Sequence, residues 1–129
     1  MLDKKNFYIN GKWVNPSKSN DFDVINPSNE ESFAKISLGN KEDTDLAVKS
    51  AKNAFINWKE TSKEERLSLL EKLLLIYKRR FKEMSEAITM EMGSPIDYSY
   101  STHTTSGQSH LEDFILRLKE FNFEERFDS

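Results

Sequence analysis

The chain has 129 residues, of which 36% are hydrophobic and 32% charged, and its 19 basic and 22 acidic residues give a formal net charge of -3. This length suits one domain, and nine Phe, two Trp and four Tyr supply bulky side chains for a core. The balanced charge argues against nucleic acid or an anionic membrane as a partner. The absence of cysteine excludes disulfides, thiolate metal sites and a cysteine nucleophile in this sequence.

The N-terminal residues MLDKKNFYIN contain no apolar core segment, so we expect no signal peptide. No apolar run approaches the roughly 20 residues that a membrane helix needs. We therefore expect a cytoplasmic protein.

Residues 6–39 have the pattern of two β-hairpins. In the stretch FYINGKWV, the pair Asn10-Gly11 separates two short apolar runs, which is typical of a type I′ turn. A second hairpin is predicted from Phe22–Ile25 and Phe33–Leu38, with Pro27 in the turn between them. We expect these four short strands to form one antiparallel patch that packs against helices.

The hydrophobic period changes from 2 to 3.6 at Asn40, which can cap a helix over 40–58. A capping box at Ser62-Lys63-Glu64-Glu65 opens a long helix over 62–92, which is either straight or bent near Arg80. A third helix is expected over 96–121, and the tail at 122–129 alternates like the start of a strand. The helices are predicted to pack through Ala51, Phe55, Trp58, Leu70, Leu73, Leu74 and Phe114.

We find no catalytic motif in the residues. His103 and His110 lie seven positions apart, unlike a chelating helical pair, so we interpret them as surface or core residues rather than metal ligands. The glycines, Gly11, Gly39, Gly93 and Gly107, are not clustered, so no phosphate-binding loop can be drawn. The basic run at 78–82 is interpreted as a solvated helix face, the alternative being an anion site.

Five short motifs in order resemble the beginning of an aldehyde dehydrogenase. They are Ile9-Asn10-Gly11-Lys12-Trp13, Asn26-Pro27, the helix from Asp45 to Trp58, the helix from Glu65-Arg66 onward, and Glu91-Met92-Gly93-Ser94-Pro95. Each motif is weak alone, but their order and separations are specific. The resemblance covers residues 6–96 and continues in looser form to Arg126.

The resemblance implies an α+β fold: two short antiparallel β-hairpins plus three to four helices, like the N-terminal outer layer of the family's Rossmann-like NAD(P)-binding domain. The family oxidises aldehydes to carboxylic acids with NAD or NADP. It uses an oxyanion-binding asparagine, a glycine turn for the cofactor, a general-base glutamate and a nucleophilic cysteine. We match none of these to this sequence. We therefore assign no catalytic and no cofactor-binding residue, and expect the chain alone to be inactive and to bind no cofactor.

The family also has a cation site near the strand that ends in Asn-Pro. The resemblance places its main-chain carbonyl ligand at Ile25, which is our candidate metal-binding position. The matching acidic side chain is missing, because the corresponding region holds Thr102-His103-Thr104.

We treat residues 1–129 as a single incomplete unit and keep three interpretations open. The chain is a fragment of an aldehyde dehydrogenase, one subunit of a split dehydrogenase, or a free-standing helical interaction module. The expected partner is accordingly the remaining dehydrogenase chain or a second copy, bound through exposed apolar stripes. The sequence does not decide the aldehyde, the choice between NAD and NADP, or the oligomeric state.

Overall fold

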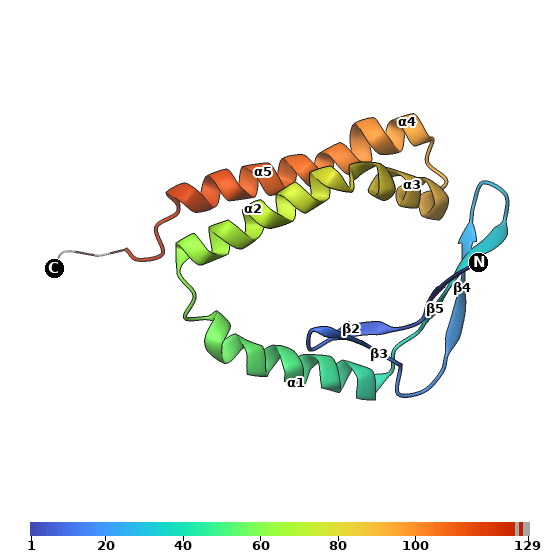
Figure 1. Cartoon of the computed structure of the whole chain (residues 1–129), viewed down its shortest axis with the longest axis horizontal. Coiled ribbons are helices and arrows are strands. Elements are labelled where there is room, and N and C mark those ends of the chain that lie inside the picture. Colours follow the sequence, from blue (N-terminus) through green and yellow to red (C-terminus); the bar gives the residue numbers. More distant parts are fainter. Residues whose placement is uncertain (126, 128–129) are drawn as a thin grey trace. The chain divides into compact units, whose positions relative to one another are not determined.

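The structure is a computed structural model that describes residues 1–125 and residue 127. The contacts within the chain define two compact units, and the single incomplete unit over residues 1–129 stays a prediction. The first contains Met1–Glu60 and Met90–Gly93, and the second contains Thr61–Thr89 and Ser94–Ser129. Each is described by itself. The mixed α+β fold, with two antiparallel hairpins beside helices, is confirmed (Figure 1).

The first unit contains a three-stranded sheet with the order β1-β5-β4. Strand β4 (Asp21–Asn26) pairs antiparallel with β5 (Glu31–Ser37), as predicted for the second hairpin. Strand β1 (Leu2–Lys4) pairs parallel with β5 and was not predicted, because LDK is too short and polar to show a strand pattern. The predicted four-stranded antiparallel patch is therefore wrong: β1 occupies the second edge of β5, and the other hairpin forms its own sheet.

That separate sheet consists of β2 (Phe7–Ile9) and β3 (Lys12–Val14). Asn10 and Gly11 connect the strands with φ values of 55° and 76°, the two positive φ angles that a type I′ turn requires, so the predicted turn is confirmed. The alternation of the strand buries Ile9 and leaves Tyr8 and Trp13 on an exposed face. Their rings form an edge-to-face pair with centroids 5.3 Å apart.

The turn between β4 and β5 is built around Asn26. Its carbonyl accepts hydrogen bonds from the amides of Asn29 (3.3 Å) and Glu30 (2.8 Å), and its side-chain oxygen accepts one from Ser28 (2.9 Å). Gly93, which follows the last residue of helix α3, approaches this turn closely. A Cβ on Gly93 would lie 2.8 Å from the Cγ of Pro27, and its φ of 71° also favours glycine.

Helix α1 (Lys41–Trp58) begins at a reciprocal cap. The Asn40 side chain accepts the Asp43 amide (3.1 Å), and the Asp43 carboxylate accepts the Asn40 amide (3.0 Å). The same carboxylate accepts the amide of Ser17 at 2.8 Å, and Asp43 is buried. The cap therefore also fastens the loop that follows β3 to the start of α1.

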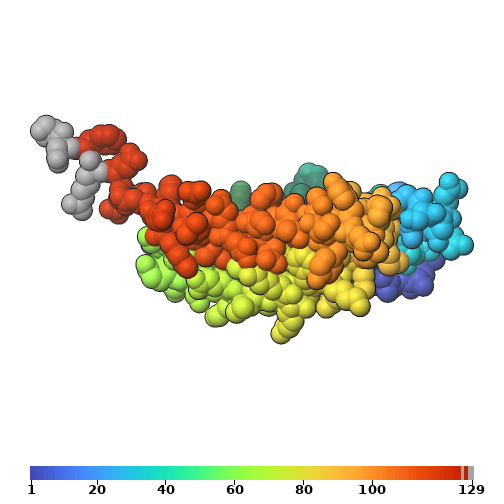
Figure 2. Space-filling view, turned by 90° about the horizontal axis from the view of Figure 1, so that it is seen from above, coloured from blue at the N-terminus to red at the C-terminus, as the bar shows by residue number. Residues whose placement is uncertain are grey.

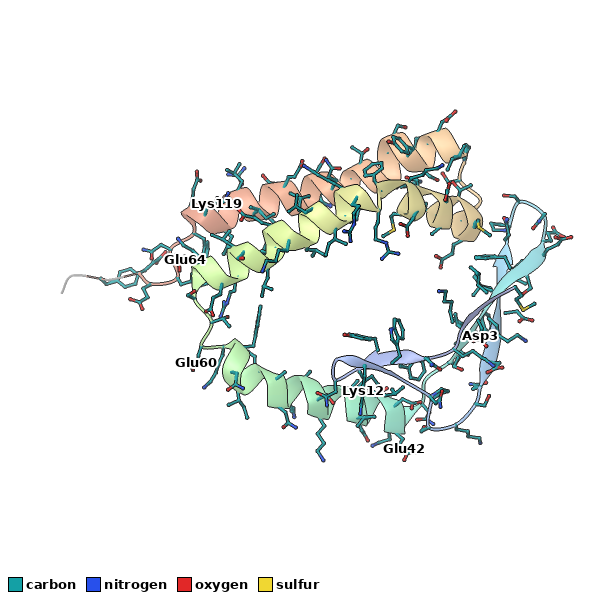
Figure 3. The ribbon with its side chains drawn as sticks, in the orientation of Figure 1. Asp3, Lys12, Glu42, Glu60, Glu64 and Lys119 are labelled. Atoms are coloured by element: carbon teal, nitrogen blue, oxygen red, sulfur yellow. The ribbon has the colours of Figure 1, made fainter. Side chains whose placement is uncertain are left out.

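The second unit is based on two helices that run side by side, α2 (Lys63–Arg79) and α5 (Thr105–Glu120) (Figures 1 and 2). Figure 3 shows Glu64 and Lys119 at the same end of this pair. There the Lys63 Nζ donates to the carbonyl of Lys119 (3.1 Å), one of the last carbonyls of α5.

The helix predicted over 62–92 is divided in the structure. Helix α2 ends at Arg79, and Arg80 leaves the helical region with φ of -100° and ψ of 16°. Helix α3 then runs from Phe81 to Met92. The interruption therefore lies at the residue where the bent alternative placed the bend.

A continuous helical segment follows, made of α4 (Ile96–Tyr98), a π-helix at Ser99–Thr104 and α5. Hydroxyl groups here bond to carbonyls of the preceding turn, as Thr105 does with Tyr100 (3.0 Å) and Ser106 with Thr102 (2.8 Å). The predicted tail forms no strand over its described residues up to Glu125, and residues 126, 128 and 129 lie outside the described part.

The structure corrects the prediction of which residues pack the helices together. Five are exposed, namely Ala51, Phe55, Trp58, Leu73 and Phe114, whereas Leu70 and Leu74 are half-buried. Among the described residues, the buried apolar side chains are instead Ile9, Ala34, Ile115 and Leu118. Helical periodicity shows which residues share a face, but it does not show that another element covers that face.

Candidate functional site

The described residues assemble no metal-binding cluster: no group of three or more His, Asp or Glu side chains among residues 1–125 and 127 could hold an ion. His103 lies in the π-helix and packs edge-on against Tyr98, with ring centroids 5.0 Å apart. His110 is exposed on α5. These positions support the interpretation of both histidines as surface or packing residues.

The candidate cation ligand, Ile25, is the penultimate residue of β4. The pairing with β5 shifts register here, because Val24 is opposite Ala34 and Ile25 is opposite Ser32. Thr102–Thr104 belong to the other unit, and the described residues supply no cluster of acidic side chains that would complete a coordination sphere. The residues present do not fit a cation by themselves, so the assignment of Ile25 stays a prediction and we derive no step through an ion.

Carboxylates on α3 and α5 pair with side chains of the basic run at 78–82. Lys78 pairs with Glu112 at 2.6 Å, and Arg80 pairs with Glu83 at 2.9 Å. The hydrogen bond from Lys78 lowers the pKa of Glu112, and the hydrogen bond to Glu83 raises the pKa of Arg80. These pairs support the interpretation of a solvated helix face.

A group of buried hydroxyls lies inside the second unit. Ser85 and Thr104 share a hydrogen bond of 2.9 Å, Thr89 donates to Ser99 at 2.9 Å, and the Tyr77 hydroxyl donates to the Thr104 carbonyl at 2.9 Å. No acid or histidine completes a nucleophilic arrangement among these contacts. The hydroxyls therefore satisfy one another and the backbone where α2, α3 and the π-helix meet.

This group of hydroxyls was not predicted from the sequence. Its signal was the run of Ser and Thr at 99–106, which indicates poor helix formers when it is considered alone. Gly107 belongs to the same contact, because a Cβ there would collide with the Tyr77 hydroxyl. Glycine thus permits the close approach of α2 and α5.

Helix α1 exposes several large apolar side chains in the first unit. Asp43 is the one buried residue of this 18-residue helix. Its exposed large apolar side chains are Leu46, Val48, Phe55, Ile56 and Trp58. A helix that exposes so much apolar surface is typical of an interface.

The second unit has an apolar pocket of about 240 Å³ at the C-terminal end of α5. Its lining residues are Phe114, Arg117, Leu118, Phe121 and Phe123. The rings of Phe121 and Phe123 pack edge-to-face at 4.9 Å, and the Arg66 guanidinium lies 5.8 Å from the Phe123 ring centroid. This pocket adds to the apolar surface that the described residues leave exposed.

No helix in the described residues is long and apolar enough to cross a membrane. The fold and its surfaces thus define a mixed α+β layer in which the described residues form no catalytic grouping and the helices present apolar faces. Comparison with known proteins identifies the family to which the chain belongs.

The sequence matches the aldehyde dehydrogenase family over residues 13–126. It is 39% identical over 126 residues to 3-succinoylsemialdehyde-pyridine dehydrogenase of a Pseudomonas species, an alignment that covers 97% of this chain and 26% of that protein. The chain belongs to the aldehyde dehydrogenase family.

Solved structures of aldehyde dehydrogenases share the fold of this chain. An aldehyde dehydrogenase from Bartonella henselae is 50% identical with a TM-score of 0.96, over 97% of this chain and 26% of that one. A mutant of aldehyde dehydrogenase C from Pseudomonas syringae, complexed with NAD+ and octanal, is 29% identical with a TM-score of 0.94, over 96% of this chain and 26% of that one. The chain thus spans about a quarter of the length of these relatives and corresponds to an N-terminal portion.

Proposed function

We propose that this chain forms the N-terminal outer layer of an aldehyde dehydrogenase fold and that its contribution is structural. The observation that carries the proposal is the set of large apolar side chains exposed on α1, a helix in which only Asp43 is buried. Covering large apolar side chains stabilises an assembly by about 1.5–3 kcal/mol for each one fully buried. We propose that the catalytic remainder of a dehydrogenase covers the apolar side chains of α1.

We propose that the complete enzyme oxidises an aldehyde to a carboxylic acid with NAD or NADP, in line with the NAD+ bound in a related structure. In this reaction a cysteine thiolate adds to the aldehyde carbon, and hydride then passes to the nicotinamide. The chain has no cysteine, so it cannot form the thiohemiacetal. We propose that by itself it is inactive and holds no cofactor.

We propose that the partner is the remaining dehydrogenase polypeptide, either continuous with this sequence or a separate chain, in the cytoplasm. A second copy of the chain is the alternative, since exposed apolar faces also favour self-association. The exposed pocket at the end of α5 supports a partner with apolar side chains in either case.

The test combines this chain with the Bartonella henselae relative from which the corresponding N-terminal portion has been removed. Co-purification and NADH formation with a series of aldehydes are measured for each polypeptide alone and for the mixture. We expect activity from the mixture only, and a large loss of activity and co-purification with Phe55→Asp. Asn53→Asp, an exposed change on the same helix, is the matched control and should leave both intact.

Two results contradict the proposal. NADH formation by this chain alone would overturn its structural role. A sharp, cooperative melt of a monomer that does not associate with the truncated enzyme would favour a free-standing interaction module instead.

A further inference from the structure

The turn at Asn10-Gly11 combines three features that bear on its chemical stability. It is the only Asn-Gly pair in the sequence. Both residues are exposed, and a Cβ on Gly11 would have no atom within 4 Å, so no neighbouring side chain crowds the turn at this residue. Within the described residues, no hydrogen bond holds the Asn10 carboxamide.

We propose that Asn10 is a site of spontaneous deamidation. The main-chain nitrogen of Gly11 attacks Cγ of Asn10, a new C–N bond forms, and the Cγ–Nδ2 bond breaks. The Nδ2 group of Asn10 takes up the amide proton of Gly11 and leaves as ammonia. The product is a five-membered succinimide. Water then opens the ring at either carbonyl, so the products are aspartate or isoaspartate, and the net change is water in and ammonia out.

The other turn asparagine, Asn29, provides an internal contrast. It is also exposed, but its side-chain oxygen accepts the Glu31 amide at 3.1 Å and its amide group donates to the Glu31 carboxylate at 3.3 Å. The next residue is Glu30, whose side chain hinders approach to its own nitrogen. Asn29 therefore shares the location in a β-turn but lacks the free carboxamide and the glycine.

The surrounding sheet favours the reaction at Asn10. The reactive geometry needs the turn to open, and the turn is closed by a two-stranded sheet with three residue pairs. Isolated two-stranded hairpins are marginally stable in water, and local opening concentrates in such elements. The turn of β4 and β5, by comparison, belongs to a three-stranded sheet.

The isoaspartate product would disturb the hairpin. It inserts an additional methylene into the main chain between the residues that close the turn, so the two-residue loop no longer matches the pairing of Ile9 with Lys12. Ile9 is one of the few buried apolar residues. We therefore expect modification to loosen the sheet and expose Ile9. This inference does not depend on the dehydrogenase assignment.

The purified chain is incubated at mildly alkaline and mildly acidic pH, and its peptides are compared by mass spectrometry over time. We expect the Asn10 peptide to become about 1 Da heavier. It should contain both aspartate and isoaspartate, and it should change several-fold faster than the Asn29 peptide. The reaction should be faster at alkaline pH, because the attacking amide nitrogen must lose its proton.

Two variants complete the design. Gly11→Ala should slow the change, and Asn29→Ala should leave the Asn10 rate unaltered. Because Gly11→Ala also strains a residue at positive φ, the comparison of Asn10 with Asn29 in the unmodified protein decides the matter. The proposal is overturned if Asn10 changes no faster than Asn29, or if its products contain no isoaspartate.

Discussion

Different interactions stabilise the interior of each of the two units. In the first unit, main-chain amides meet a buried carboxylate, since Asp43 accepts hydrogen bonds from Ser17 and Asn40. In the second unit, buried hydroxyls bond to one another and to the backbone, and Gly107 lets α2 and α5 approach closely. Each unit has only two buried apolar residues among those described: Ile9 and Ala34 in the first, Ile115 and Leu118 in the second. Directional polar contacts therefore define local structure in both.

The largest effect is expected from Gly107→Val, which places a side chain against the Tyr77 hydroxyl. We expect the free energy of unfolding of the second unit to fall by about 1–3 kcal/mol, because the helix pair has no room for the added atoms. Urea denaturation followed by circular dichroism measures the loss. The control is Gly39→Ala in the first unit, where a Cβ would make ordinary contacts with Phe7.

The same contact has a second test. Tyr77→Phe removes the atom that collides first, so combining it with Gly107→Ala should recover part of the stability lost in Gly107→Ala alone. A strictly additive loss in the double variant would mean that the hydroxyl does not limit the approach of α2 and α5.

The next largest effect is expected at low pH, where protonation of Asp43 destabilises the first unit. Hydrogen bonds from the amides of Ser17 and Asn40 lower the pKa of Asp43. A lowered pKa means that the folded state binds the proton less readily than the unfolded state. The carboxylate therefore stabilises the fold above its unfolded pKa of about 3.9, and this contribution is lost as the pH falls through the lower, folded value.

The Asp43 prediction is tested by following the unfolding midpoint from neutral to acidic pH in the native chain and in Asp43→Asn. We expect Asp43→Asn to be less stable at neutral pH and to lose less stability on acidification. Because main-chain amides hold the carboxylate, added salt should change the difference little. Parallel pH curves for the two proteins would refute the prediction.

The smallest effect is expected at the Lys78–Glu112 pair of the second unit. Lys78 also lowers the pKa of its partner carboxylate, but both side chains are partly exposed. Glu112→Gln should reduce stability slightly at low salt and hardly at all at high salt, because ions screen exposed pairs. Differential scanning calorimetry at two salt concentrations measures it. An effect as large and as salt-independent as that of Asp43→Asn would remove the contrast between the units.

Local features could be predicted from the sequence. The turn at Asn10-Gly11 and the caps at Asn40 and Ser62 each depend on residues within three or four positions of one another. Each of the five motifs is also short and local, so their order was sufficient to indicate the family. The matching sequences and structures confirm the family.

Features that join distant segments could not be predicted. Strand β1 forms because β5 offers it an edge, and Leu2 pairs with Ala34, far away in the sequence. The contact of Tyr77 with Gly107 depends on the path of two helices. The stripe containing Phe55 was assigned to the core because its period is helical, and it is exposed because no described element covers it.

The short strand β1 has a consequence for solubility. By pairing with Ala34–Ile36 it covers the middle of one edge of the seven-residue strand β5, where another chain could otherwise add a strand. The edges that remain are β1 itself, with Asp3 and Lys4, and β4, with Asp21 and Asp23. Charged side chains on short edge strands oppose strand addition by neighbouring molecules. Three residues at the N-terminus thereby protect the sheet from edge-to-edge aggregation.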